Sequence, residues 1–152
     1  MHQVRPSLLA AGLTTLATAA ALGLAPGTAL AAPSPAASAP TISVNWFGVA
    51  DVHAHTGTVR GRFDCGDERG LAYIEVHLAQ RVRGTNVTGF GFGVIGACTD
   101  ERTAGTWTAT VPADAGTFRP GPATTTARLV VEPNSLTETT ERLRLLPHCP
   151  RH

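Results

Sequence analysis

Short runs of alternating apolar and polar residues recur along the chain from residue 41 onward. The runs are rich in Val, Ile, Thr and aromatic residues, and clusters of Gly, Pro, Asn and Asp separate them. Alternation with period two is typical of strands that bury one face, and no stretch of this part favours a helix. The pattern predicts seven strands, at about 41–49, 57–65, 71–82, 86–98, 105–112, 122–132 and 137–146.

The alternation also predicts the buried face of each strand. The residues expected to face inward are Val59, Gly61, Phe63 and Cys65; Ile74, Val76 and Leu78; Phe90, Phe92, Val94 and Cys98; Trp107, Ala109 and Val111; Ala127, Leu129 and Val131; and Leu143 and Leu145. Antiparallel strands with one apolar face each can bury those faces by closing two sheets on one another. We therefore expect an all-β fold, a two-sheet antiparallel β-sandwich, with a small barrel as the alternative.

The segment Gly89-Phe90-Gly91-Phe92-Gly93 alternates within the fourth predicted strand. It lacks the Lys and the following helix of a phosphate-binding loop. With the phenylalanines inward, the glycines would leave the outer surface bare. Such a surface suits close approach of another backbone or a flat ligand, and packing against a neighbouring strand is the commoner cause.

The first residues have the pattern of a signal peptide. Arg5 precedes an apolar stretch of Ala, Leu, Gly and Thr, and Ala29-Leu30-Ala31 fits the small-x-small cleavage site. We expect a signal peptide at 1–31, a disordered Ala/Pro/Ser leader at 32–40, the β-domain at 41–146 and a C-terminal tail at 147–152. An uncleaved anchor is the alternative, but the apolar stretch is short for a membrane span.

Composition and charge limit the function classes. The chain has no Lys, and without Arg5 the remaining arginines equal the 11 acidic residues in number. A balance of zero gives no electrostatic case for binding nucleic acid or an anionic membrane. The arginines with abundant Ala, Gly, Thr and Pro are typical of GC-rich coding, which indicates an actinobacterial source. We expect a secreted, extracellular and monomeric mature chain that is not inserted in a membrane.

Three cysteines occur, and an exported chain meets an oxidising environment that favours pairing over metal ligation. Cys65 and Cys98 each end a predicted strand on its inward face, so we expect a disulfide between them. Cys149 is then left over as a free thiol, as half of an intermolecular bridge, or as the true partner of one of the others.

Several short motifs resemble one family. They are Phe63-Asp64-Cys65, the strand with Ile74, Val76 and Leu78, Gly96-Ala97-Cys98, Gly105-Thr106-Trp107, and Phe118-Arg119-Pro120-Gly121-Pro122-Ala123. Together they are similar to small secreted actinobacterial proteins of the Streptomyces type with an Ig-like domain. The resemblance covers about Thr41 to Val131 and implies an Ig-like β-sandwich behind a signal peptide, with a cysteine pair and no implied activity. Cys149 lies outside it.

Two groups of residues suggest metal ligands. His53 and His55 would share a face with Asp51 if the segment were extended, although glycines on either side favour a solvated turn. The tail offers His148, Cys149 and His152, at a terminus that favours adventitious binding. Neither group supplies the fixed set of three or four ligands that a specific site needs, so no metal or other cofactor is predicted.

A disulfide between Cys65 and Cys98 would bring two acidic loops together. Their carboxylates belong to Asp64, Asp67, Glu68, Asp100 and Glu101. Calcium takes six to eight oxygen ligands from flexible loops, so this cluster is a calcium candidate. Arg62, Arg69 and Arg102 lie among the carboxylates and could neutralise them without a metal.

The residues that catalysis needs are few. After residue 31 the chain has only four serines, and it has no Gly-x-Ser-x-Gly, no His-Glu-x-x-His and no Lys. We therefore predict no enzyme and no catalytic residue.

We instead expect a non-catalytic binding module in the extracellular or cell-wall space. Its partner would be an unknown protein, a cell-wall polymer or a small molecule. The alternative is a small secreted inhibitor or carrier. The segment 112–122 is the one that resembles an inhibitory loop, with Phe118 and Arg119 as candidate anchors, and an ordinary crossing loop is the competing interpretation.

Overall fold

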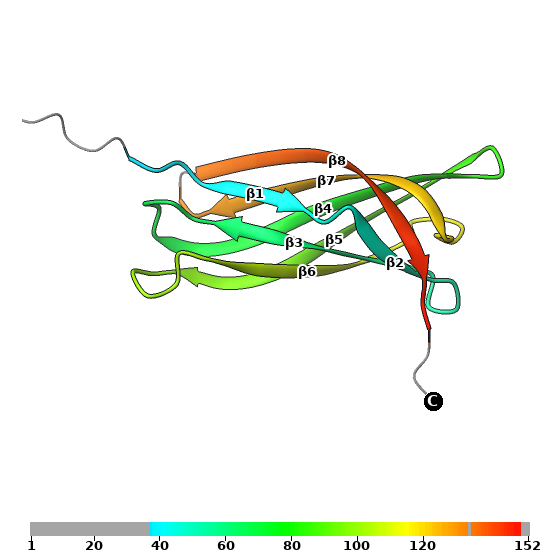
Figure 1. Cartoon of the computed structure of the whole chain (residues 1–152), viewed down its shortest axis with the longest axis horizontal. Helices are drawn as coiled ribbons and strands as arrows, with labels where there is room; N and C mark the ends of the chain where they lie inside the picture. The colour runs from blue at the N-terminus through cyan, green and yellow to red at the C-terminus, as the bar shows by residue number, and fades with distance from the viewer. Residues whose placement is uncertain (1–36, 134, 150–152) are drawn as a thin grey trace, which may run out of the picture. The chain divides into compact units, whose positions relative to one another are not determined.

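The computed structural model describes residues 37–133 and 135–149, and this part of the chain is all-β (Figure 1). Its strands are β1 (Thr41–Val44), β2 (Phe47–Asp51), β3 (Thr56–Asp64), β4 (Gly70–Val82), β5 (Thr85–Cys98), β6 (Ala104–Pro112), β7 (Gly121–Val131) and β8 (Ser135–Pro147). Within the described ranges there is no helix with the length and apolarity needed to cross a bilayer. The predicted signal peptide, 1–31, lies outside the described residues.

The first predicted strand, 41–49, is two strands in the structure, and the other six predicted strands are confirmed near their expected bounds. The chain breaks at Asn45 and Trp46, where the backbone N–H of Asn45 donates to the carbonyl of Arg60 at 2.8 Å. β1 and β2 pair one after the other with the same edge of β3. The break lets β2 turn toward β8 as well, which a continuous strand beside β3 would not do.

The eight strands form one continuous hydrogen-bonded arrangement. β3 has β1 and β2 on one edge and β6 on the other, all antiparallel. β5, β4, β7 and β8 follow one another as an antiparallel series. The two series meet where β2 runs parallel to β8, with Phe47–Ala50 beside Arg144–Pro147. At the far ends, β5 and β6 share no ladder, only an isolated bridge between Gly89 and Ala113.

The inward faces of all the long strands meet in one hydrophobic core. The faces predicted for β3, β4, β6, β7 and β8 are confirmed, because every residue expected to face inward there is buried. Trp107 covers Gly61, and its indole N–H lies 3.2 Å from the carbonyl oxygens of both Ser43 and Arg62. Its ring is therefore buried with its one polar group satisfied.

The predicted orientation of most of β5 is wrong. Phe92 and Val94 point outward, with 55% and 87% of their surface exposed, while the intervening glycines point into the molecule. A bulge explains the error: Val94 pairs with Tyr73 and Gly96 with Ala72, so Ile95 is an extra residue. After an extra residue, the alternation of inward and outward side chains is shifted by one position. Cys98 therefore faces inward as expected, although the phenylalanines do not.

The inward glycines of β5 let its backbone lie close to that of β6. A Cβ atom on Gly91 would come within 2.5 Å of the carbonyl oxygen of Thr110, and one on Gly93 within 3.2 Å of that of Thr108. Gly89 makes the same kind of approach to Pro112. At Gly89 and Gly91 only glycine fits, because a Cβ atom would overlap the carbonyl oxygen of the other backbone.

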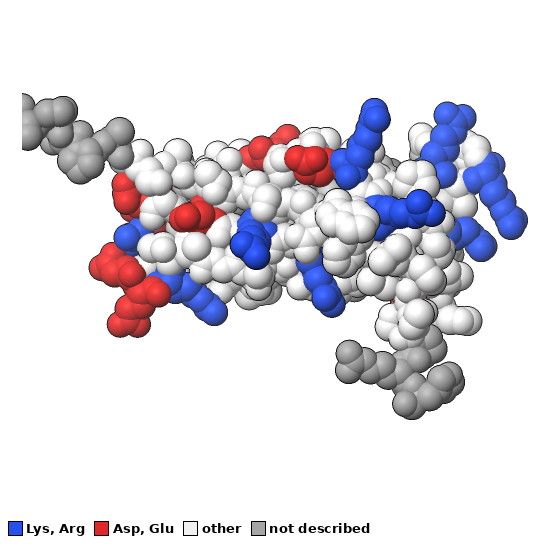
Figure 2. All heavy atoms as spheres, viewed as in Figure 1, with Lys and Arg blue, Asp and Glu red and all other residues white. Residues whose placement is uncertain are grey.

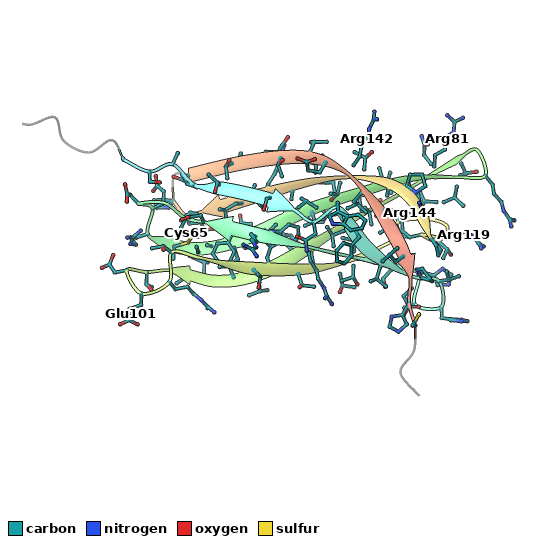
Figure 3. All side chains as sticks on the ribbon, in the orientation of Figure 1. Cys65, Arg81, Glu101, Arg119, Arg142 and Arg144 are labelled. Atoms are coloured by element: carbon teal, nitrogen blue, oxygen red, sulfur yellow. A yellow bond between two sulfur atoms is a disulfide. The ribbon has the colours of Figure 1, made fainter. Side chains whose placement is uncertain are left out.

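Cys65 and Cys98 form the predicted disulfide, with their Cα atoms 6.2 Å apart (Figure 3). It joins the residue after β3 to the last residue of β5, and both cysteines are buried. A disulfide of this kind indicates an oxidising compartment.

We predict that Gly91→Ala lowers the free energy of unfolding by about 1–3 kcal/mol, because the new methyl group must displace the β6 backbone. Urea denaturation under non-reducing conditions measures this change. Val94→Thr, a substitution on the exposed face of the same strand, is the matched control. Equal stability of the two variants would contradict the close approach.

We predict that replacing both cysteines, in Cys65→Ala/Cys98→Ala, lowers stability by about 3–4 kcal/mol, because the bridge closes a loop with a sequence separation of 33. The check is the denaturation midpoint of the oxidised wild type against that of the double variant. The denaturation midpoint of the wild type in reductant should approach that of the double variant. A midpoint in the variant that matches the oxidised wild type would show that the bridge adds nothing.

Candidate functional site

Phe118, expected from the sequence as a candidate anchor on an exposed loop, is buried in the structure. Its side chain is 0% exposed and lies over Gly57, beside Leu78, in the core. A Cβ atom on Gly57 would lie 2.4 Å from a Leu78 methyl carbon and 3.4 Å from the ring, so the space left by the glycine is filled mainly by Leu78. The segment 112–122 is therefore held to the core by the residue that was expected to project from it, and only Arg119 of the two candidate anchors is exposed.

Gln80 fixes the same loop through its side-chain amide. This residue is 6% exposed; its Nε2 donates to the carbonyl of Arg119 at 2.7 Å, and its Oε1 accepts from the Arg119 N–H at 2.9 Å. The buried amide thus binds the backbone N–H and the backbone carbonyl of one residue, which are the two hydrogen bonds that a neighbouring strand would otherwise make. The Arg119 side chain is thus presented from a rigid position at the end of the molecule (Figure 3).

His53 and His55 do not share a face with Asp51, because residues 52–55 form a turn. The Asp51 carboxylate accepts the backbone N–H groups of His53 at 3.0 Å and Ala54 at 2.9 Å. His55 has a φ of 56° and directs its Nδ1 to the Thr117 hydroxyl, 2.6 Å away. His53 therefore contacts Asp51 through its backbone N–H, whereas the ring of His55 contacts Thr117.

The turn meets the C-terminal segment instead. Nε2 of His148 lies 4.0 Å from Oδ2 of Asp51, and a pocket of about 260 Å³ opens between Ala50–His53 and Pro147–His148. The hydrogen bond from the Ala54 N–H is the main cause that lowers the pKa of Asp51, and the charge of His148 acts in the same direction. The sequence presented these residues as two separate candidates, and the parallel pairing of β2 with β8 brings them together.

The acidic loops do lie at one end, but their oxygens are used locally. Asp64 accepts the N–H of Gly66 at 2.8 Å, Asp67 accepts that of Ser38, and Arg69 pairs with Asp100 at 2.8 Å. Across residues 37–133 and 135–149, no three His, Cys, Asp or Glu side chains are grouped so as to hold a metal ion. Two of the carboxylates thus bind backbone N–H groups, and Asp100 forms a surface ion pair.

The contact between Ser38 and Asp67 also bears on the leader predicted at 32–40. The Asp67 N–H donates to the Ser38 carbonyl at 3.0 Å, and the Asp67 carboxylate accepts the Ser38 N–H. The chain thus makes backbone contacts with the domain before the predicted boundary at Thr41. At the other end, Cys149 is a free, exposed thiol.

An exposed apolar surface on β4 and β5 is the feature that the sequence did not predict. We call it the aromatic face; it consists of Leu71, Tyr73, His77, Phe90, Phe92 and Val94. His77 pairs with Phe90 across the two strands, and Tyr73 with Val94. The rings are in contact, with centroids 4.7 Å apart for His77 and Phe90, 4.7 Å for Phe90 and Phe92, and 6.3 Å for Tyr73 and Phe92.

The rings of the aromatic face meet edge to face. The planes of Phe90 and Phe92 are 81° apart and those of Tyr73 and Phe92 are 61° apart. The planes of His77 and Phe90 are 45° apart, so the rings do not share one plane that could serve as a flat stacking platform. Glu75 is on the same side of β4, opposite Phe92.

Comparison with protein-family models and with curated proteins finds no match to this chain.

We predict that the Asp51 turn makes stability depend on pH. The lowered pKa means that the folded state binds its proton less readily than the unfolded state, so the stabilisation is complete above the ordinary value of about 4 and is lost as the pH falls through the folded value. The difference in melting temperature between wild type and Asp51→Ala should narrow below about pH 4.

Asp51→Asn keeps an acceptor oxygen without the charge and serves as the control. The difference in melting temperature between Asp51→Asn and Asp51→Ala should change little with pH. A gap between wild type and Asp51→Ala that stays constant down to pH 2.5 would contradict the role of the carboxylate.

Proposed function

We propose that the domain is an Ig-like β-sandwich. The support is the strand pairing: β3 with β1, β2 and β6 forms one antiparallel group, and β8, β7, β4 and β5 form another. β5 and β6 share no ladder, so the two groups are not joined into one sheet along this side, as expected of two layers. The parallel contact of β2 with β8 joins the layers at one side.

We propose further that the chain is exported and acts by binding, as a non-catalytic module in the extracellular or cell-wall space. The disulfide supports an oxidising compartment. The sequence supports export through the signal-peptide pattern at 1–31. The few serines and the absence of Lys support binding over catalysis.

The aromatic face is the contact surface in this proposal, and its exposure is the main support for binding. Phe92, Val94 and Leu71 expose more than half of their surface, with values of 55%, 87% and 56%. Neighbouring exposed apolar side chains are costly in water, so a contiguous patch of them marks an interaction surface. The face lies at the rim of the β8, β7, β4 and β5 group, where a partner can reach it.

The adjoining edge of β5 strengthens the case. β5 is the last strand of its series, and residues 85–98 include no charged residue and no Pro. Natural edge strands usually carry Lys, Pro or other charges that discourage pairing with another chain. The carbonyls of Thr88 and Ile95 already accept from the Asp114 N–H at 2.8 Å and from the Arg102 guanidinium at 3.3 Å. The stretch between them, next to the apolar face, suits a partner that adds a strand and places apolar side chains against Phe92 and Val94.

The partner is a protein in this proposal, not a glycan. Sugar rings stack on flat aromatic faces, whereas these rings present their edges to one another at 81° and 61°. The aliphatic side chains of Leu71 and Val94 complete the surface, and such a mixture matches the apolar centre of protein interfaces.

The test places a photo-crosslinking residue, p-benzoylphenylalanine, at position 94 of the chain expressed in its own host. Illumination of the culture should give one discrete protein adduct, at least tenfold weaker when Phe92→Ser is added. The same residue at position 108, on the exposed side of β6, is the matched control and should give none.

Equal labelling from positions 94 and 108 would overturn the proposed surface. A heterogeneous, glycan-sized smear would overturn the choice of a protein partner, and an adduct of twice the chain mass would replace that partner with a second copy. No adduct at either position would contradict the proposal as a whole.

A further inference from the structure

The near-zero charge balance of the chain hides a segregation of charge along the molecule. In the view of Figure 2, most of the visible acidic side chains lie over one half of the molecule and a group of arginines stands at the opposite end, with further arginines between the two and among the acidic side chains. In Figure 3, Glu101 and Cys65 lie at the first end, and Arg81, Arg119, Arg142 and Arg144 lie toward the second. The formal net charge of the whole sequence is only +1, so composition gave no sign of this.

Three of these arginines stand on the outer face of one group of strands, and we call them with Thr124 the arginine face. Arg142 of β8 pairs with Thr124 of β7, which pairs in turn with Ala79 of β4. Arg81 is two residues beyond Ala79, on the same face, and Arg144 is two residues beyond Arg142. Thr124 therefore lies directly beside Arg142 on one side and diagonally from Arg81 on the other.

The arginine face contains a shallow groove of about 340 Å³. Its lining residues are Ala79, Gln80, Arg81, Pro122, Ala123, Thr124 and Arg142. Strands are about 4.8 Å apart, so β4 and β8 are separated by about 10 Å across β7. Arg142 and Arg144 are about 7 Å apart along β8. The charges are thus spread over a strip that is wider than one small anion.

These guanidinium groups lack the carboxylate partners that Arg69 and Arg128 have. Arg128 pairs with Glu138, which raises its pKa, and Arg69 pairs with Asp100. Among the described residues, no carboxylate lies within 4.0 Å of the guanidinium of Arg81, Arg142 or Arg144. Glu141 precedes Arg142 but faces the other side of β8, because side chains alternate along a strand.

Like charges held near one another repel, and an anion between them relieves that repulsion. The planar guanidinium group matches phosphate oxygens with two parallel hydrogen bonds, and a threonine hydroxyl can donate a further one. The groove offers this chemistry along a strip, so the ligand it suits carries several phosphates in sequence.

We propose that the arginine face binds a linear phosphodiester polymer of the cell envelope, with Arg81, Arg142 and Arg144 each contacting a phosphate and Thr124 at the floor. No aromatic side chain lines the groove, so it has no ring on which a nucleic-acid base could stack. The site is on a different surface from the aromatic face and shares with that proposal only the expected export.

The experiment measures binding of the secreted protein to poly(glycerol phosphate) by isothermal titration calorimetry at about 50 and 200 mM salt. Wild type should bind, and more weakly at the higher salt, because each contacted phosphate releases counterions. Arg142→Gln/Arg144→Gln should weaken binding at least tenfold. Arg60→Gln/Arg62→Gln removes two exposed arginines with the same spacing from β3 and should leave the affinity within twofold.

An equal loss of affinity in the two double variants would show that binding depends only on net charge and would overturn the site. Absence of binding by the wild type would overturn it as well. Equal or tighter binding to inorganic phosphate, to phosphatidylglycerol vesicles or to duplex DNA would overturn the polymer as the ligand. Arg81→Gln, a single change on another strand, should weaken binding threefold or more and tests the same groove if the double variant does not fold. Photo-crosslinking from position 94 should be unchanged in these variants, so the two proposals can fail separately.

Discussion

The approach of β5 to β6, backbone against backbone, is the constraint on which the rest of the arrangement depends. Gly89, Gly91 and Gly93 face inward, and a methyl group on Gly91 would already meet the carbonyl oxygen of Thr110. Because glycine must take the inner positions, the alternate positions must face outward. Phe90, Phe92 and Val94 occupy them. The exposed aromatic face is therefore a direct result of how closely the two backbones lie.

Much of the fold could be predicted from the sequence because one-sided burial imposes period two on most strands. Val59, Ile74, Trp107 and Leu129 were all placed on the correct face by alternation alone. The pattern failed in β5 because a bulge at Ile95 changes its phase, and because the distance to β6 decides whether glycine or phenylalanine faces inward. Neither fact is local to the strand. The compartment-based pairing of Cys65 with Cys98 succeeded, since each cysteine ends a strand on its buried side.

The candidate sites were less predictable than the fold. Phe118 stands in a Pro- and Gly-containing segment that is typical of an exposed loop. Its ring nevertheless packs beside Gly57 and Leu78, which are far away in the sequence. The arginines are scattered from residue 81 to residue 144, and only the pairing of β8 with β7 and of β7 with β4 gathers them. Asp51 and His148 meet for the same kind of reason, through the parallel contact of β2 and β8. Sites built from several strands depend on register, which residue spacing alone does not reveal.

The disulfide has a further consequence because of what its loop encloses. Cys65 and Cys98 bracket the whole of β4, the turn at Arg83 and Gly84, and nearly all of β5. The exposed Arg83 has a φ of 50° in that turn, and a backbone that projects from the end of a long hairpin is accessible to trypsin-like proteases. A cut there would leave two fragments held by the bridge and by the strands on either side. The nicked molecule would keep its shape and its surfaces, and only reduction would reveal the break.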